Sequence, residues 1–307
     1  MAFRSGFAAI LGRPNAGKST LLNALAGEKI AIVTRKPQTT RNRIQGIVNV
    51  PAGKGHSAGQ IVFIDTPGVN KPGSTFDRSM MREVRAALEG CELLLVIIDA
   101  HARRTDAAGE KFLLRLAKEN SRPALLLLNK IDLVPKPELL PLIERYSQHG
   151  FAEIIPISAL RKQGLDEIIR AVLARLPEGR RYFPQDQLSD QPDRFLVGEL
   201  VREQLLKLTG QEVPYSSAVV VERFEEGPRL TRIAAVIYCE RNGQKAIIIG
   251  RGGQMLKKIG SAARAEIERR LGTKVFLELF VKLQPGWRES IEFVEGLDWR
   301  RQLERLN

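Results

Sequence analysis

The sequence predicts two domains: an α/β domain with a mostly parallel sheet, and after it a smaller α+β domain. Its 307 residues are enough for two domains of about 150 residues each. From residue 1 to about 176, apolar strand-like runs alternate with helical patterns, which is typical of a parallel α/β sheet. The pattern changes after "PEGRRYFPQDQLSDQPDR", a stretch rich in proline and polar residues at 177–194. We expect domains at 1–178 and 193–284, a linker at 179–192 and a helical tail at 285–307.

The elements of the first domain follow from apolar runs and helical spacing. The turn-rich segment 51–60 allows a hairpin between its neighbouring strands. The longest apolar runs, 93–98 and 124–128, are far shorter than the ~20 residues of a membrane helix and indicate buried strands. Strands are expected at 7–11, 44–50, 61–65, 93–99, 124–128 and 154–157, and helices at 18–26, 77–89, 106–119, 138–148 and 165–175.

The second domain shows a different order of elements and no internal repeat. Its apolar run "AIIIG", just before a glycine loop, is compatible with a strand or with the end of a helix. We expect a helix at 193–208, strands at 216–225 and 230–240, a helix at 254–271 and a strand at 274–283.

The net charge of +13 favours an anionic partner, although a basic surface can also serve solubility alone. Residues 1–54 carry nine basic residues and one acidic residue, and residues 241–274 carry nine and two. The second cluster surrounds the glycine loop. The two cysteines, Cys91 and Cys239, lack metal-ligand spacing, and Cys91 precedes a buried strand. A reduced thiol in a cytosolic protein is therefore expected.

A phosphate-binding loop is predicted by "GRPNAGKS" at 12–19, which lies between a strand and a helix. Glycines let successive backbone N–H groups surround phosphate oxygens, and the following helix directs its positive end at the same anion. Lys18 would reach the β- and γ-phosphates, and Ser19 would bind Mg²⁺. The residues expected around the phosphates are Gly12, Arg13, Pro14, Asn15, Ala16, Gly17, Lys18, Ser19 and Thr20.

The motif "NKID" after the buried strand 125–128 predicts that the base is guanine. A carboxylate at Asp132 can accept hydrogen bonds from both N1–H and N2–H₂ of guanine, a pair of donors that adenine does not offer. Mismatch would leave a buried carboxylate unpaired. The stem of Lys130 would lie along the base, and Asn129 would tie this loop to the phosphate loop. The remaining expected contacts are Ile131 and, from "ISALRKQG", the backbone of Ser158 and Ala159 at guanine O6.

Metal and γ-phosphate contacts are expected from "IVFIDTPGV" and "VTRKPQTTRNR". Asp65 ends an apolar strand and would hold Mg²⁺ through water. Thr40 would close onto the ion when the γ-phosphate is present, with Thr39 as the alternative. An ordinary polar loop with a helix cap would also explain these threonines. The metal set is thus Ser19, Thr40 and Asp65, the catalytic set is Lys18, Thr40, Gly68 and Asn15, and the remaining contacts are Thr66, Pro67 and Val69.

The motifs GRPNAGKS, QTTR, DTPG, NKID and SAL, in this order, resemble those of translation-factor-related GTPases. Val69 stands where Ras-like enzymes place the glutamine that orients the attacking water. This departure resembles a subgroup in which the asparagine of the phosphate loop helps to hold a potassium ion. Asn15 matches that asparagine, and its other role would be to stabilise the loop turn. The resemblance implies slow intrinsic hydrolysis of GTP to GDP.

The second domain contains the glycine loop Gly250–Gly253, "GRGG", followed by a basic helix. Glycines at both ends let a phosphate backbone come close, and the helix supplies charge. The loop and the order of elements resemble a type II KH domain, which clamps about four single-stranded nucleotides. The other explanation is a tie between two helices beside a solvated basic face. The residues expected to bind RNA are Gly250, Arg251, Gly252, Gly253, Lys257 and Lys258.

Both domains and their linker together are similar to the Era family of bacterial GTPases. This resemblance implies binding to the 3′ end of 16S rRNA and a role in maturation of the small (30S) ribosomal subunit. It also implies peripheral contact with the inner membrane. Apart from the resemblance, we expect the protein to be a cytoplasmic monomer. A non-enzymatic RNA-binding protein that uses guanine nucleotide only structurally remains an alternative. A membrane-trafficking GTPase is disfavoured by the KH-like module and by the lack of a lipid anchor motif.

Overall fold

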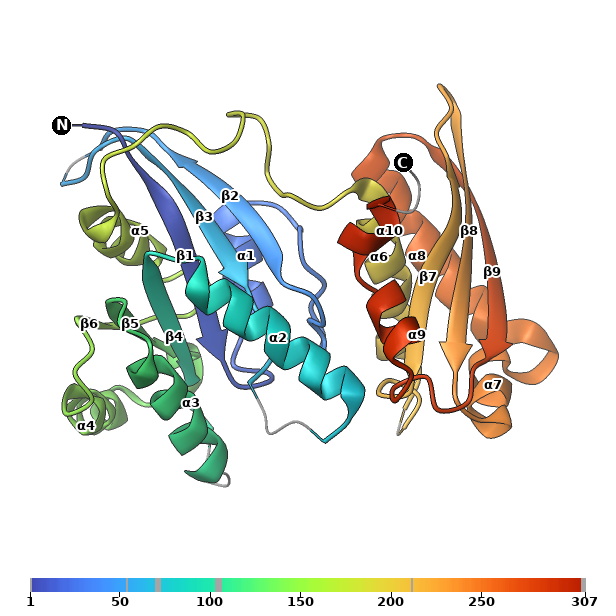
Figure 1. Ribbon diagram of the computed structural model, residues 1–307, viewed down its shortest axis with the longest axis horizontal. Coiled ribbons are helices and arrows are strands. Elements are labelled where there is room, and N and C mark those ends of the chain that lie inside the picture. The colour runs from blue at the N-terminus through green and yellow to red at the C-terminus, as the bar shows by residue number, and fades with distance from the viewer. Residues whose placement is uncertain (1, 54, 70–72, 103–106, 211, 305–307) are drawn as a thin grey trace. The chain divides into compact units, whose positions relative to one another are not determined.

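The computed structural model describes residues 2–53, 55–69, 73–102, 107–210 and 212–304 (Figure 1). By their contacts, these residues divide into two compact units. The first unit comprises 1–31, 40–71 and 80–190, and the second comprises 32–39, 72–79 and 191–307. The bounds of the expected strands and helices differ from those observed by three residues or fewer. The last three residues of the expected tail, 305–307, lie outside the described residues.

The first unit is built on a six-stranded sheet of order β2-β3-β1-β4-β5-β6 (Figure 1). All neighbouring strands are parallel except β2 and β3, which form the expected antiparallel hairpin. The carboxyl ends of the parallel strands therefore meet at one end of the sheet, where ligands of such folds bind. The strands are β1 (Arg4–Gly12), β2 (Ile44–Val50), β3 (Gly59–Asp65), β4 (Leu93–Asp99), β5 (Ala124–Asn129) and β6 (Glu153–Pro156).

Helices cover both faces of this sheet because its strands are apolar on both sides. Ala8 and Ile10 of β1 pack in a core with α1 (Lys18–Ala26) and α5 (Leu165–Arg175). Their neighbours Ala9 and Leu11 pack in a second core. This alternation is the two-residue period of a strand. The helices around the second core are α2 (Thr75–Glu89), α3 (Ala107–Glu119) and α4 (Lys136–Ser147), and a short turn, η1 (Ile131–Leu133), follows β5.

Most of the expected linker is bound to the first unit. Gln60 is fully buried, and its side-chain oxygen accepts hydrogen bonds from the N–H groups of Tyr182 and Phe183 at 2.8 and 3.0 Å. The N–H of Ile47 donates to Leu188 O at 2.9 Å. An edge strand such as β2 exposes unpaired backbone groups, and the segment up to residue 190 satisfies some of them. This contact explains why 179–190 group with the first unit rather than forming a free connection.

The second unit has a three-stranded sheet of order β7-β8-β9, with β7 and β8 antiparallel and β8 and β9 parallel. Because β8 and β9 are parallel, the chain must cross over between them, and helices α7 and α8 form this connection. The apolar run before the glycine loop is helical, which resolves the alternative left by the sequence. The elements are α6 (Asp193–Leu208), β7 (Ser217–Glu225), β8 (Leu230–Cys239), α7 (Asn242–Ile249), η2 (Arg251–Gly253), α8 (Gln254–Leu271), β9 (Lys274–Leu283), α9 (Ile291–Gly296) and α10 (Trp299–Glu304).

Helices α6 and α8 pack on the inner face of this sheet, and Leu200, Ile237 and Ala263 are among the buried residues of the core. Both cysteines are buried and free, as expected for reduced thiols. None of the helices in the described part of the chain has both the length and the apolar character needed to cross a bilayer.

Candidate functional sites

The predicted phosphate loop joins the last residue of β1 to the first residue of α1. Gly17 has a φ of +100°, and a Cβ there would lie 2.3 Å from the side-chain nitrogen of Asn129. A Cβ at Gly12 would lie 2.7 Å from the carbonyl oxygen of Ile97. Both positions therefore require glycine for steric reasons. Asn15 also has a positive φ, 62°, a conformation that asparagine tolerates better than most residues.

Lys18 is buried inside this loop, where its Nζ donates to the carbonyl oxygens of Gly12 and Arg13 at 3.1 and 3.0 Å. Burial lowers the pKa of Lys18 to about 8, and the Asp65 carboxylate opposes this shift. The ammonium group is thus held among loop carbonyls, at the position from which the sequence predicts that it reaches phosphates.

The three predicted metal ligands converge although they come from separate segments. The Ser19 hydroxyl donates to Asp65 Oδ2 at 2.6 Å and lies 2.7 Å from the Thr40 hydroxyl. Thr40 donates to the same carboxylate oxygen at 3.1 Å. The hydroxyl of Thr39 instead donates to Lys36 O at 2.7 Å. The geometry therefore favours Thr40 over Thr39 as the ligand.

One oxygen of the Asp65 carboxylate is available to bind a cation. Its second oxygen, Oδ1, is buried and has no hydrogen-bond partner among the described residues. Burial raises the pKa of Asp65, whereas Lys18 and the two hydroxyl groups lower it. Mg²⁺ prefers oxygen ligands, and both hydroxyl and carboxylate oxygens are present here. A bound cation would also explain why Asp65 Oδ1 is buried without a hydrogen-bond partner among the described residues. The donor set therefore fits Mg²⁺.

Asn129 connects the phosphate loop to the predicted base-binding loops. Its side-chain nitrogen donates to Ala16 O at 2.7 Å, and its side-chain oxygen accepts from Ala159 N at 3.0 Å. The Ser158 N–H donates to Gln163 O at 3.2 Å. Both backbone groups expected at guanine O6 thus donate to protein acceptors, so contact with O6 requires a shared hydrogen bond and stays a prediction.

The side chains of the base-binding motif are fixed by neighbours. Asp132 accepts a hydrogen bond from the Ser158 hydroxyl at 2.6 Å, which orients its carboxylate. Lys130 has a φ of +68° and forms an ion pair with Asp99 at 2.6 Å. Sequence reasoning missed Asp99. Its signal was available, because it ends the buried strand β4 as Asp65 ends β3.

The "DTPG" segment packs directly on the phosphate loop. Thr66 donates from its hydroxyl to Ile10 O at 2.8 Å, and the Val69 N–H donates to Gly12 O at 3.0 Å. A Cβ at Gly68 would lie 2.8 Å from the nitrogen of Pro14. Val69 itself is buried in the apolar core and brings no polar group to the site. The remaining predicted contacts lie within these same segments: Thr20 in α1, Pro67 before Gly68, and Ile131 in η1.

A groove of about 360 Å³ lies beside the glycine loop of the second unit, between α8 and β9. Among the predicted RNA-binding residues, Gly253 and Lys257 line it, and Lys258 does not. Sequence reasoning missed Ser261 and Arg264, although their helical spacing from Lys257 places them on the same face of α8. The complete lining is Gly253, Leu256, Lys257, Gly260, Ser261, Arg264, Leu277 and Leu279.

The glycines of this loop differ in their requirements. A Cβ at Gly250 would lie 2.7 Å from the Cβ of Met255, so a side chain there would disturb the fold. Gly252 and Gly253 have positive φ values of 57° and 79°, but a Cβ at either position would meet no neighbouring atom within 4 Å. The space beside Gly253 is therefore open to a ligand, and Arg251 is exposed next to it.

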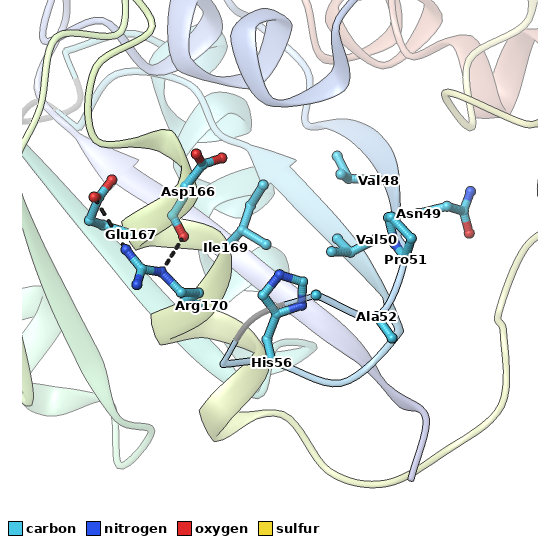
Figure 2. Close-up of a pocket in the computed structure, with 11 residues that line it drawn as sticks. Val48, Asn49, Val50, Pro51, Ala52, His56, Asp166, Glu167, Ile169 and Arg170 are labelled. Atoms are coloured by element: carbon cyan, nitrogen blue, oxygen red, sulfur yellow. Dashed lines mark hydrogen bonds and ion pairs between the residues drawn. The ribbon is translucent and has the colours of Figure 1, made fainter. Parts of the chain in front are cut away.

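A second groove, of about 480 Å³, lies in the first unit between the end of β2 and the first turns of α5 (Figure 2). It contains His56 and an ion pair between Arg170 and Glu167 at 3.3 Å. None of the predicted nucleotide contacts lines it. Val50 pairs with Gly59, the first residue of β3, so this strand end is opposite to the one that carries the phosphate loop.

Comparisons with known proteins match both parts of the chain. A family model described as 50S ribosome-binding GTPase matches residues 7–130, and one described as KH domain matches residues 212–288. A protein of Geobacter sp. (strain M21) named GTPase Era is 49% identical over 293 residues, which cover 94% of this chain and 95% of the relative. The chain belongs to the Era family of GTPases. A GTPase Era of Lacticaseibacillus paracasei is 46% identical over 298 residues, 96% of each chain.

Solved structures of Era-family members have the same fold. One is Era in complex with MgGDPNP and nucleotides 1506–1542 of 16S ribosomal RNA, with a TM-score of 0.90 and 40% identity over 97% of this chain and 99% of that chain. Another is an Era variant of Aquifex aeolicus bound to GDP·AlF₄⁻, with a TM-score of 0.89 and 40% identity over 96% and 99%. The expected GTPase activity and fold class are confirmed by the family, and the non-enzymatic alternative is set aside.

We predict that nucleotide affinity falls above pH 8. Phosphates stabilise the protonated form of Lys18, so the pKa in the complex lies above the value of about 8 in the free protein. Below pH 8, Lys18 is protonated in both the free and the nucleotide-bound protein, so the affinity does not change with pH. Above it, binding must take up a proton, and the affinity for GDP should fall about tenfold per pH unit. Calorimetric titration with GDP between pH 7 and 9 measures this, with Lys18→Arg as the control that stays charged. Equal pH profiles for parent and variant would contradict the prediction.

We predict that Asp132→Asn changes the preferred base from guanine to xanthine. The amide can donate to xanthine O2 but cannot accept both guanine donors, so GTP binding should weaken by about a hundredfold. Competition between GTP and XTP for a fluorescent GDP measures the ratio. Asp99→Asn is the matched control: it removes the ion pair with Lys130, and it should weaken both nucleotides without changing their ratio. An unchanged ratio in Asp132→Asn would refute the assignment.

Proposed function

We propose that this GTPase is a nucleotide-controlled switch that binds the 3′ end of 16S rRNA and acts in the assembly of the 30S ribosomal subunit. The observation that carries the RNA part is the groove between α8 and β9, which opens beside the GxxG loop. Its chemistry suits a nucleic acid, because it combines an apolar floor with a cationic rim. The Era relative solved with nucleotides 1506–1542 of 16S ribosomal RNA supports the choice of ligand.

In the nucleotide site, Lys18 would bind the β- and γ-phosphates and Asp132 would select guanine. Ser19 and Thr40 would hold Mg²⁺ directly, and Asp65 would hold it through water. When bound, the ion would neutralise charge that builds up on the phosphates. Gly68 would donate its N–H to the γ-phosphate, a contact supported by its close packing on Pro14. The convergence of Ser19, Thr40 and Asp65 supports the proposed metal role.

The site must hydrolyse GTP without a glutamine after "DTPG", because Val69 is buried and apolar. We propose that Asn15 instead helps to hold K⁺ near the phosphates, where a cation can stabilise negative charge in the transition state. Its place in the phosphate loop supports this role. The positive φ of Asn15 is equally compatible with a role in the turn alone.

In the RNA groove, the phosphate backbone would pass the open space at Gly252 and Gly253. Lys257 and Arg264 line the groove and would attract it electrostatically. The bases would lie against the apolar floor made by Leu256, Leu277 and Leu279. Arg251 and Lys258 are exposed outside this lining and would add longer-range attraction.

Cytoplasmic location, peripheral contact with the inner membrane and a monomeric state complete the proposal. The membrane contact rests on the resemblance to the family and the cytoplasmic location on the reduced cysteines, and all three stay predictions. Fractionation of cells that express the tagged chain would measure the first two, and light scattering the third.

We predict that the RNA clamp depends on Gly253 and not only on charge. Gly253→Asp places a carboxylate in the open space beside the loop and should reduce RNA binding by at least about a hundredfold, even at low salt. Lys257→Ala should weaken binding less and lower the salt slope by about 0.7. Titration of an RNA from the 16S rRNA 3′ end at several salt concentrations distinguishes these results. GTP binding should be unchanged in both variants. If Gly253→Asp bound this RNA like the parent, the loop would be only a structural turn.

We predict that Asn15→Ala removes any stimulation of hydrolysis by K⁺ relative to Na⁺. Phosphate release under multiple turnover, at matched ionic strength in the two salts, measures this effect. Val69→Ala is the control: it removes apolar atoms near the site without a polar group and should keep the K⁺ response. The same K⁺ response in Asn15→Ala would assign the asparagine to loop structure alone.

A further inference from the structure

Residues 32–39, which lead directly to Thr40, pack with α6 in the second unit. Ile32 is 1% exposed and belongs to the hydrophobic core of that unit. The Val33 N–H donates to Glu203 Oε1 at 3.1 Å. The Arg202 guanidinium donates through Nη2 to the carbonyl oxygen of Thr39. Helix α6 thus holds both ends of the segment.

A further contact holds the middle of the segment. The Lys36 Nζ donates to the carbonyl oxygen of Thr209, the residue that follows the last turn of α6. Burial lowers the pKa of this lysine. Each of the three polar contacts joins the segment to α6 or to its carboxyl end, so one helix fixes the course of the whole segment.

Arg202 and Glu203 are unusual in being charged and almost fully buried, with exposed fractions of 2% and 1%. Arg202 pairs with Glu199, and Glu203 pairs with Lys207 at 3.3 Å. The Nη1 of Arg202 is buried without a hydrogen-bond partner among the described residues. Apolar residues often replace buried ion pairs with no loss of stability. Stability alone therefore does not explain why charges occupy these two positions.

We propose that Arg202 and Glu203 are positioning residues for GTP hydrolysis, which hold segment 32–39 so that Thr40 reaches Mg²⁺. The Thr39 carbonyl and the Thr40 N–H belong to one planar peptide group. A hydrogen bond to that carbonyl fixes the orientation of the plane and hence the start of Thr40. The proposal rests on the proposed role of Thr40 as a metal ligand, and it extends the catalytic requirement to α6.

The test is a double-mutant cycle between Arg202→Met and Thr40→Ala in the full chain. Arg202→Met should lower the single-turnover hydrolysis rate about tenfold and raise the Mg²⁺ concentration for half-maximal rate, while GDP affinity changes little. Because it leaves Glu199 without its partner, it should also lower the melting temperature, so the rates are compared at a temperature at which both proteins are folded. Hydrolysis in Thr40→Ala should be slow, and adding Arg202→Met to it should have no further effect, because both act through one group. Arg194→Met is the matched control, since Arg194 lies on α6 but donates to Val221 O.

A second pair of variants tests the other contact and remains informative if Arg202→Met fails to fold. Glu203→Gln keeps an oxygen that accepts from Val33 N, and it should retain hydrolysis. Glu203→Met removes the acceptor and should lower the hydrolysis rate of the chain that carries Thr40. It should not lower the rate of the Thr40→Ala variant any further. The same rate loss in both variants would assign the effect to charge and contradict positioning.

The outcomes separate this inference from the proposed function. Normal hydrolysis in Thr40→Ala would overturn the metal-ligand role and with it the positioning role. Slow hydrolysis in Thr40→Ala, together with an unchanged rate in Arg202→Met, would overturn the positioning role alone. An equal rate loss from Arg202→Met in both backgrounds would also overturn it, because the arginine would then act independently of Thr40.

Discussion

The buried carboxylate of Asp65 is the interaction on which the nucleotide site depends. Burial disfavours its charged form and raises its pKa. The charge of Lys18 and the hydroxyl groups of Ser19 and Thr40 stabilise the charged form and oppose this shift. One oxygen is still unpaired among the described residues. A site balanced in this way is completed by a divalent cation, because the cation supplies the charge that the protein leaves out. The carboxylate therefore links the sheet, the phosphate loop and the segment that carries Thr40.

Close backbone packing keeps these groups in place. Gly12, Gly17 and Gly68 each lie where a Cβ would collide with a neighbouring segment. The side chain of Asn129 then joins the phosphate loop to the loop that carries Ala159. The site is a set of loops held together at contact distance. A small displacement of one loop would break hydrogen bonds to the others. The loops therefore need the rigid strands that anchor them.

The second unit contains both the groove beside the glycine loop and the helix that contacts segment 32–39. Its α8 and β9 form the groove beside the glycine loop, and its α6 contacts the segment that precedes Thr40. Both α6 and α8 contribute to the same hydrophobic core. Packed cores do not deform continuously, so a change at one of these helices is felt by the other through shared contacts. The groove and the helix that contacts segment 32–39 therefore share one core within the second unit.

The sequence by itself determined the α/β order of the first domain, the phosphate loop, the guanine motif and the family, because these depend on local spacing and on side chains that follow strands. It did not determine which threonine approaches Asp65, because Thr39 and Thr40 differ only in orientation. It also missed the attachment of 179–190 to Gln60, since this contact joins residues distant in sequence. Asp99 and Arg264 were missed although local signals existed, namely the end of a buried strand and the helical spacing from Lys257. The placement of 32–39 beside Arg202 was decided by tertiary packing alone: nothing in a short polar segment shows which buried charge will bind its backbone.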